Sequence, residues 1–337
     1  MPASIEAAMR DPDWLPHRYD PGHDAVHLIH ASRDARRRAT FLTDTELGPR
    51  EPLVVRRRDA VPAAPPSPLH FVFHSAYCCS TLIARALDRS GTATSLKEPQ
   101  ILNDLVGWRH RGGASSHVGQ VLTDSLRLLA RPFVEGEAVV LKPSNVVNGL
   151  AEAMLLAAPD ARAILLYAPL DAFVTSIARK GMWGRLWVRD LLSKQLADGL
   201  IDLGFAPSDY LLHTDLQVAA VGWLAQQALF GRLAATYPQR VRILDSEELV
   251  AAPAATMARV ASLFDLALDA TEIDAIVAEE FSRDAKSGSR FVEGRRERDK
   301  SSGESLHADE IEKVVTWAMA VADQAGVEIV PGRALRL

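Results

Sequence analysis

The residues best suited to chemistry lie directly after a short apolar run near residue 70. LHFVFH (69–74) is typical of a buried parallel strand, and STLIARALDRSG (80–91) has helical spacing, with Gly91 as its predicted C-cap. The turn between them leads into a helix that opens with Ser80 and Thr81. Because backbone N–H groups and the positive end of the helix face such a turn, the pattern favours a bound phosphate or sulfate. The alternative is that the two hydroxyls only cap the helix.

The elements that must position this turn alternate along the chain. Apolar runs near 92–97, 138–142 and 162–167 predict further strands, RVRILDSEELV (240–250) predicts a fifth strand and a turn, and stretches with helical spacing separate them. One of these helices is expected to start with Asp171 as its N-cap. Alternating strands and helices predict an α/β fold with a doubly wound, mostly parallel central sheet flanked by helices. Ligands of such sheets bind beyond the carboxyl ends of the strands, so the residues after each strand are the candidates for a site.

The N-terminal region differs from this pattern. A short strand is expected at 25–31, a helix over DARRRATFLT (34–43), and a strand over PLVVRRRDAV (52–61). A Pro-rich stretch at 61–69 is expected to be an extended connector. We therefore predict an N-terminal appendage over residues 1–65 and an α/β domain over residues 66–337.

Composition limits the class of protein. The chain has 337 residues, a formal net charge of −5 and two cysteines, which are neighbours in sequence. This slightly acidic balance gives no support for nucleic-acid binding, and no long uncharged run predicts a membrane span. A disulfide framework is excluded, and the first residues do not have the pattern of a signal peptide. We expect a cytoplasmic protein.

The turn after the first core strand resembles the phosphosulfate loop of sulfotransferases that use 3′-phosphoadenosine 5′-phosphosulfate (PAPS). Aligned on the hydroxyl pair, Cys79-Ser80-Thr81-Leu82 replaces the Gly-Thr-Thr-Trp or Gly-Thr-Thr-Leu of that family. Further segments are similar in order and spacing to bacterial members, so the resemblance covers about residues 68–300. These segments are SLKEPQILNDL (95–105), RILDSEELVAAPAATMARVASLFDL (242–266) and FSRDAKSGSRF (281–291).

The resemblance implies PAPS as co-substrate, no metal, and a set of residues that contact PAPS. The loop would hold the phosphosulfate, whereas a hydroxyl after the fourth strand and a basic segment near the C-terminus would hold the 3′-phosphate. A solvated charge run is the alternative for the basic segment. The implied residues are Ser75, Ala76, Tyr77, Cys78, Cys79, Ser80 and Thr81 in the loop, Thr175 or Ser176 after the fourth strand, and Lys286 and Arg290 in the basic segment.

Sulfuryl transfer needs a cation on the leaving group and a base for the acceptor proton. Lys142 is placed to stabilise the leaving phosphate; an exposed strand-end lysine is its alternative. His74, which ends the first strand, is the base candidate by position, or else a core histidine. Glu98 is a second base candidate, or it pairs with its neighbour Lys97 as a structural ion pair.

The chain departs from the family pattern at three positions. Tyr77 stands where the loop has a lysine or arginine, Tyr167 stands at an arginine position, and Ser144 lies in a segment that lacks the usual histidine. The vicinal thiols could alternatively make a reactive cysteine at the helix N-terminus.

These observations leave three functions open. The first is a sulfotransferase that acts on an unknown hydroxyl or amine acceptor. The second is a phosphotransferase or other nucleotide-binding protein on the same fold, although the loop has neither the glycine nor the lysine of the Walker pattern. The third is a non-catalytic binding module. The expected partners are a nucleotide co-substrate and an acceptor, without nucleic acid or membrane, and a homodimer is a further possibility.

Overall fold

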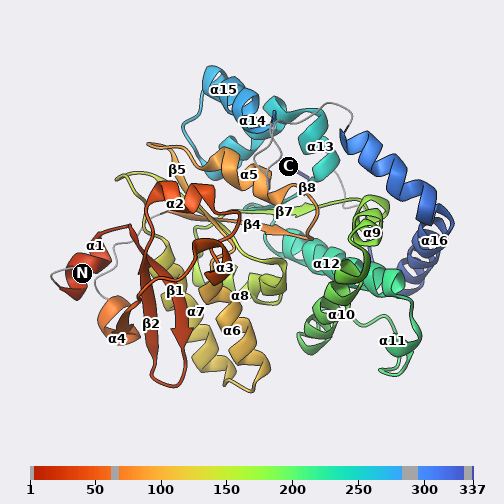
Figure 1. Cartoon of the computed structure of the whole chain (residues 1–337), viewed down its shortest axis with the longest axis horizontal. Coiled ribbons are helices and arrows are strands. Elements are labelled where there is room, and N and C mark those ends of the chain that lie inside the picture. Colours follow the sequence, from red (N-terminus) through yellow and green to blue (C-terminus); the bar gives the residue numbers. More distant parts are fainter. Residues whose placement is uncertain (1–3, 62–67, 283–294, 330–335) are drawn as a thin grey trace.

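The computed structural model describes residues 4–61, 68–282, 295–329 and 336–337 (Figure 1). Its central sheet has five parallel strands in the order β5-β6-β4-β7-β8. The bounds are β4 Leu69–His74, β5 Ala93–Lys97, β6 Ala138–Lys142, β7 Ala163–Tyr167 and β8 Val241–Asp245. The doubly wound α/β prediction is confirmed, with the five predicted core strands in place.

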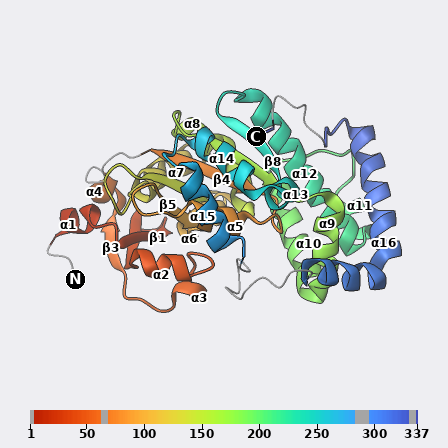
Figure 2. The same ribbon diagram turned by 90° about the horizontal axis from the view of Figure 1, so that it is seen from above.

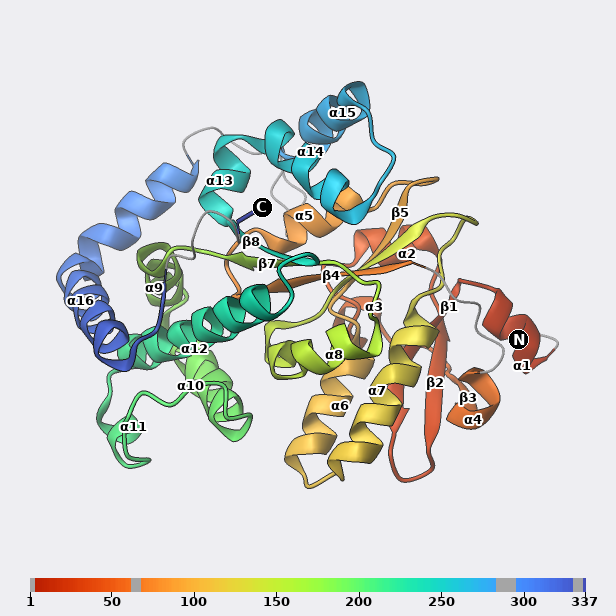
Figure 3. The same cartoon turned by 180° about the vertical axis from the view of Figure 1, so that it is seen from behind.

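Helices cover both faces of this sheet. One face carries α5, α13, α14 and α15, and the other carries α6, α7, α8 and α12 (Figures 1 and 3). A further group of helices, α9, α10, α11 and α16, lies at the end of the molecule beyond β7 and β8 (Figure 2). The bounds are α5 Ser80–Leu87, α6 Gln100–His110, α7 Ser115–Leu129, α8 Ala151–Ala157, α9 Leu170–Arg179, α10 Gly181–Ala197, α11 Asp209–Leu212, α12 Asp215–Thr236, α13 Ser246–Ala251, α14 Pro253–Phe264, α15 Ala270–Glu280 and α16 Arg295–Ala325.

The strand order places a switch point at β4. The chain leaves β4 for the far edge at β5, returns to β6 beside β4, and then crosses to β7 on the other side of β4. The carboxyl ends of β4 and β6 are therefore neighbours at the point where the winding reverses. Open α/β sheets bind their ligands at such points.

A second sheet lies in the N-terminal region. Its three strands are antiparallel in the order β1-β2-β3, with bounds β1 Trp14–Asp20, β2 Ala25–His30 and β3 Leu53–Arg56. Short helices α1 (Ile5–Arg10), α2 (Arg33–Arg38), α3 (Asp44–Leu47) and α4 (Arg57–Ala60) surround it. The sheet packs against α6 and α7 (Figure 3).

This N-terminal region is joined to the main body by Arg131, which is buried, and by Arg33, which is partly buried. Arg131 donates to the carbonyl oxygens of Met9 (2.9 Å) and Trp14. Arg33 reaches Glu137 (2.7 Å) and Asp88 (2.8 Å) at the edge of the central sheet. The N-terminal region and the central sheet share one hydrophobic core.

The structure corrects four local predictions. The first core helix ends at Leu87, so Gly91 lies in the following turn with φ +83° rather than at the helix end. Helix α9 starts one residue before Asp171, with Pro169 as its N-cap. The strand predicted over 52–61 is shorter than expected, because β3 ends at Arg56 and helix α4 follows it. The stretch after β6, which has the helical spacing noted between the strands, begins as a 3₁₀ turn, η2 Asn145–Leu150, before α8. Most of the predicted connector at 61–69 lies outside the described residues.

Candidate functional site

The loop between β4 and α5 has an unusual backbone. Ala76, Tyr77 and Cys79 have φ angles of +73°, +52° and +63°, and none of the three is glycine. Each such residue costs about 1–3 kcal/mol and persists only where its surroundings hold it. Cys79 is the N-cap of α5, with φ 63° and ψ 19°. A left-handed residue there is what a glycine would supply without strain, so the backbone agrees with the alignment of Cys79 on the loop glycine of sulfotransferases.

His74 holds the start of this loop. Its Nδ1 accepts from the N–H of Ala76 (3.1 Å), which requires the proton on Nε2, and Nε2 donates to the carbonyl of Pro143 (3.1 Å). The ring is buried at the end of β4. Both ring nitrogens thus bond the backbone on either side of the switch point. This geometry favours a positioning role over proton abstraction, although the catalytic role of His74 stays a prediction.

Side chains from α12 and η2 complete the support. Asn148 donates to the carbonyl of His74 (3.0 Å) and to Oε1 of Gln226 (3.0 Å), and Gln226 in turn faces the carbonyl of Ser75 (3.5 Å). The Ser75 hydroxyl accepts from the N–H of Ala168 (3.2 Å) at the end of β7. Ser75 is therefore engaged in fixing the loop. Asn148 and Gln226 escaped the sequence analysis because nothing in their local pattern marks them.

The two cysteines differ in their surroundings. Cys78 is fully buried, and burial raises the pKa of its thiol to about 11. A thiol with this pKa stays protonated at neutral pH, which disfavours Cys78 as a nucleophile. Cys79 is partly exposed at the start of α5, where Ser80 and Thr81 follow as buried residues of the first turn.

Lys142 and Glu98 meet beside the loop. The Lys142 ammonium is paired with Oε1 of Glu98, and the same oxygen lies 3.7 Å from Nε2 of His74. The Lys142 side chain is 1% exposed and the Glu98 side chain 16%. The expected alternative of an exposed strand-end lysine is therefore wrong. Three of the predicted residues converge at the carboxyl ends of β4, β5 and β6.

Glu98 has a strained backbone at this position. Its φ is +53° and its N–H donates to the carbonyl of Lys142 (2.6 Å). Leu42 of the N-terminal region bonds the backbone before and after Glu98. Its N–H donates to the carbonyl of Lys97 (2.7 Å), and its carbonyl accepts from the N–H of Gln100 (3.1 Å). The neighbouring Phe41 ring lies 5.2 Å from the Lys142 ammonium. Residues 41–42 therefore line the site, a contribution that the sequence did not reveal.

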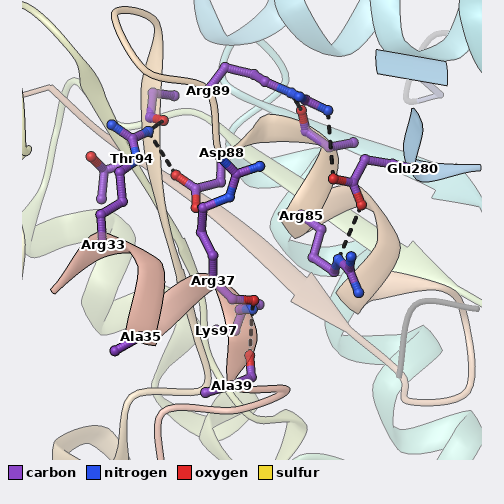
Figure 4. Close-up of polar contacts among 12 residues, drawn as sticks. Arg33, Ala35, Arg37, Ala39, Arg85, Asp88, Arg89, Thr94, Lys97 and Glu280 are labelled. Atoms are coloured by element: carbon purple, nitrogen blue, oxygen red, sulfur yellow. Dashed lines mark hydrogen bonds and ion pairs between the residues drawn. The ribbon is translucent and has the colours of Figure 1, made fainter. Parts of the chain in front are cut away.

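Lys97 points away from Glu98, so the predicted structural pair between these neighbours does not form. Its ammonium donates to the carbonyls of Ala39 (2.5 Å) and Arg37 (3.0 Å), and burial lowers the pKa of Lys97 to about 8. Figure 4 shows this lysine at the edge of a polar cluster that joins α2, β5, α5 and α15. The ion pairs of that cluster include Arg33 and Arg37 with Asp88, and Arg85 and Arg89 with Glu280.

Two of the residues predicted for the 3′-phosphate, Thr175 and Ser176, lie on α9. Thr175 is buried, and the hydroxyl of Ser176 donates to the carbonyl of Ala172 (2.8 Å). Tyr167, at the position of the family's arginine, is buried at the end of β7, where burial raises the pKa of its hydroxyl. Lys286 and Arg290 lie outside the described residues. Their part in a site stays a prediction.

Residues 4–61, 68–282, 295–329 and 336–337 contain neither a cluster of metal ligands nor a helix that could span a membrane. In this part of the chain, no group of three or more His, Cys, Asp or Glu side chains could hold a metal ion. Within the same ranges, none of the helices has the length and apolar character needed to cross a membrane.

No protein-family model matches the sequence, and no curated protein matches it. Among solved structures, the chain is similar to sulfotransferase STF9 from Mycobacterium avium, with 15% identity, a TM-score of 0.43, and coverage of 76% of this chain and 79% of the other. It is also similar to sulfotransferase STF1 from Mycobacterium tuberculosis, with 15% identity, a TM-score of 0.41, and coverage of 68% and 76%.

Proposed function

We propose that the protein transfers a sulfuryl group from PAPS to a hydroxyl or amine acceptor. The observation that carries this proposal is the β4–α5 loop, in which three left-handed residues without glycine precede the N-terminus of α5 at the switch point of the sheet. A turn that leads into a helix N-terminus suits an anion, because the first N–H groups of the helix have no partner within the helix. The resemblance of this loop and three later segments to PAPS-dependent sulfotransferases supports a phosphosulfate as that anion.

The residues around the loop suit each part of the transfer. The acceptor oxygen or nitrogen attacks sulfur, the bond from sulfur to the bridging oxygen of PAPS breaks, and PAP leaves with the electron pair. Lys142 would stabilise the charge that grows on the leaving phosphate. Glu98, whose carboxylate is partly exposed beside Lys142, would take the acceptor proton. His74 would keep the loop in place through its two backbone hydrogen bonds.

The 3′-phosphate would bind near α9. Thr175 or Ser176 would supply a hydroxyl, and the basic segment that contains Lys286 and Arg290 would supply charge. Ser176→Ala and Thr175→Val remove the two hydroxyls one at a time. The variant that weakens PAP binding identifies the hydroxyl that contacts the phosphate.

Calorimetric titration with PAP, ATP and ADP tests the proposal. We expect micromolar binding of PAP and much weaker binding of ATP and ADP. Tight ATP binding without PAP binding would instead indicate a phosphotransferase or another nucleotide-binding protein, and no binding of any of the three would indicate a non-catalytic module.

Glu98→Gln tests the catalytic step separately. Glutamine keeps an oxygen for the Lys142 ammonium but cannot take a proton at neutral pH. We expect release of PAP from PAPS to slow by at least about tenfold while PAP affinity changes less than about threefold. Equal losses in both quantities would remove Glu98 from the proton transfer.

A further inference from the structure

Helix α10 is apolar on two opposite sides. Its inner side buries Gly184, Val188, Leu191, Leu192 and Gln195, and it packs against α12 and α9 (Figures 1 and 2). On the outer side of the first two turns, Met182, Trp183 and Leu186 are 70%, 61% and 61% exposed. The solvent side of a surface helix is normally polar, and a cluster of large exposed apolar side chains marks a site of interaction.

This exposed face is connected to the β4–α5 loop by aromatic rings. Trp183 stacks on Trp187, one helical turn further along, with centroids 6.3 Å apart and an interplanar angle of 9°. Trp187 then meets Tyr77 of the loop edge to face, at 5.7 Å and 88°. We call Tyr77, Trp187 and Trp183 the aromatic row. It leads from the proposed phosphosulfate loop to an indole ring that is open to solvent.

We propose that the aromatic row is the acceptor subsite and that the acceptor is a hydroxyl compound with a planar aromatic ring. This inference rests on the proposed function for the transfer itself, but the ring site is argued from α10 and the loop. A planar ring gains about 0.5–1.5 kcal/mol from a stacked or edge-to-face aromatic partner beyond the area it buries. A carbohydrate acceptor needs many hydrogen-bonding side chains, whereas the three large exposed side chains in the first two turns of α10 offer one polar group, the indole N–H of Trp183.

The inner end of the row also suits an aromatic acceptor. Burial raises the pKa of Tyr77 to about 12, so its ring carries no charge at neutral pH. Tyr77 stands where the family's loop has a lysine or arginine. At this position of the loop the chain therefore has an aromatic ring in place of a cation. The Tyr77 ring contacts Trp187, which in turn contacts the exposed Trp183.

Binding of 2-naphthol to the full-length protein tests the inference. Titration by calorimetry, with and without saturating PAP, compares the wild type with Trp183→Ala and Trp183→Phe. We expect Trp183→Ala to weaken 2-naphthol binding by about three- to tenfold and Trp183→Phe to restore most of it, because phenylalanine keeps a ring face. Leu211→Ala on α11 is the matched control, since Leu211 is 80% exposed and apolar but does not belong to the aromatic row.

The outcomes separate this inference from the proposed function. Absence of 2-naphthol binding, equal binding by wild type and Trp183→Ala, or equal competition by N-acetylglucosamine would each overturn the aromatic acceptor. A dimer of the wild type that Trp183→Ala dissociates in light scattering would also overturn it, since a second copy would then cover the face. Binding of 2-naphthol that depends on Trp183, in a protein that does not bind PAP, would uphold the ring site and refute the sulfotransferase.

Discussion

Replacing Lys142 with methionine removes the cation that faces Glu98 at the carboxyl end of the sheet. Loss of one partner from a buried pair costs about 3–5 kcal/mol, because the other charge stays buried without compensation. Glu98 is 16% exposed and regains some water, so we expect about 2–3 kcal/mol for Lys142→Met. With an unfolding entropy of about 0.7 kcal/mol/K for 337 residues, this loss lowers Tm by about 3–4 °C in calorimetry.

Two further variants identify the source of this loss. Glu98→Gln leaves an ammonium that is 1% exposed, and we expect it to cost at least as much as Lys142→Met. The double variant removes both charges, so its loss is expected to fall below the sum of the single losses by about 2 kcal/mol. Lys313→Met is the control: Lys313 pairs with Asp309 at 2.7 Å, but the two side chains are 73% and 82% exposed. An exposed pair contributes about 0–1 kcal/mol. Additive losses in the double variant, or equal shifts of Tm for Lys142→Met and Lys313→Met, would refute the reasoning.

Three other predictions concern two buried side chains and one left-handed residue. Burial lowers the pKa of His70, which stacks on Phe264 at 4.8 Å, to about 4, so the wild type is expected to lose about 3 kcal/mol relative to His70→Phe as the pH falls from 6.5 to 4. The sign follows because the unfolded chain takes up the proton first, and denaturant unfolding across this pH range measures it. Arg131→Met removes the side-chain donor to the carbonyls of Met9 and Trp14. We therefore expect a lower Tm and faster proteolysis of the N-terminal region. Cys79→Gly relieves a left-handed residue and is expected to raise stability by about 0.5–1 kcal/mol, whereas Cys79→Val lowers it.

Each of these expectations has an outcome that contradicts it. For His70, parallel pH profiles of wild type and variant would show that burial does not hold its ring neutral. For Arg131, a digestion rate equal to that of the wild type would mean that its backbone contacts do not fasten the N-terminal sheet. For Cys79, an increase in stability with valine would show that the residue does not need the left-handed conformation.

The sequence predicted the features that depend on neighbouring residues. The central strands are short apolar runs bounded by turns. Because the local pattern and the burial in the sheet favour the same structure, the positions of these strands could be predicted from the sequence. The anion loop was readable for the same reason, since strand, turn and helix follow one another within residues 69–87. Helix ends were harder: Pro169 sets the start of α9 before Asp171, because its fixed φ already suits the entry into a helix.

The contacts within the site could not be read in this way. Glu98 has a lysine beside it in sequence, but backbone alternation at the end of β5 sends Lys97 to the carbonyls of Arg37 and Ala39. The cation that does meet Glu98 is 44 residues away, on another strand. Phe41 reaches the same point from the N-terminal region. Such pairs depend on strand order, which a single sequence does not specify.

The placement of the N-terminal region has a consequence for synthesis on the ribosome. Its contacts join residues far apart in the chain: Arg33 pairs with Glu137 over 104 positions, and Arg131 bonds Trp14 over 117. At about 5–20 residues per second, the first strands wait on the order of ten seconds before these partners are made. During that interval β1 and β2 expose their apolar faces and strand edges. The strands β1 and β2 are thus made well before Arg131, Glu137 and helices α6 and α7, which cover them. Nascent chains of this protein are therefore expected to need protection of these two strands until the chain has been made to about residue 137.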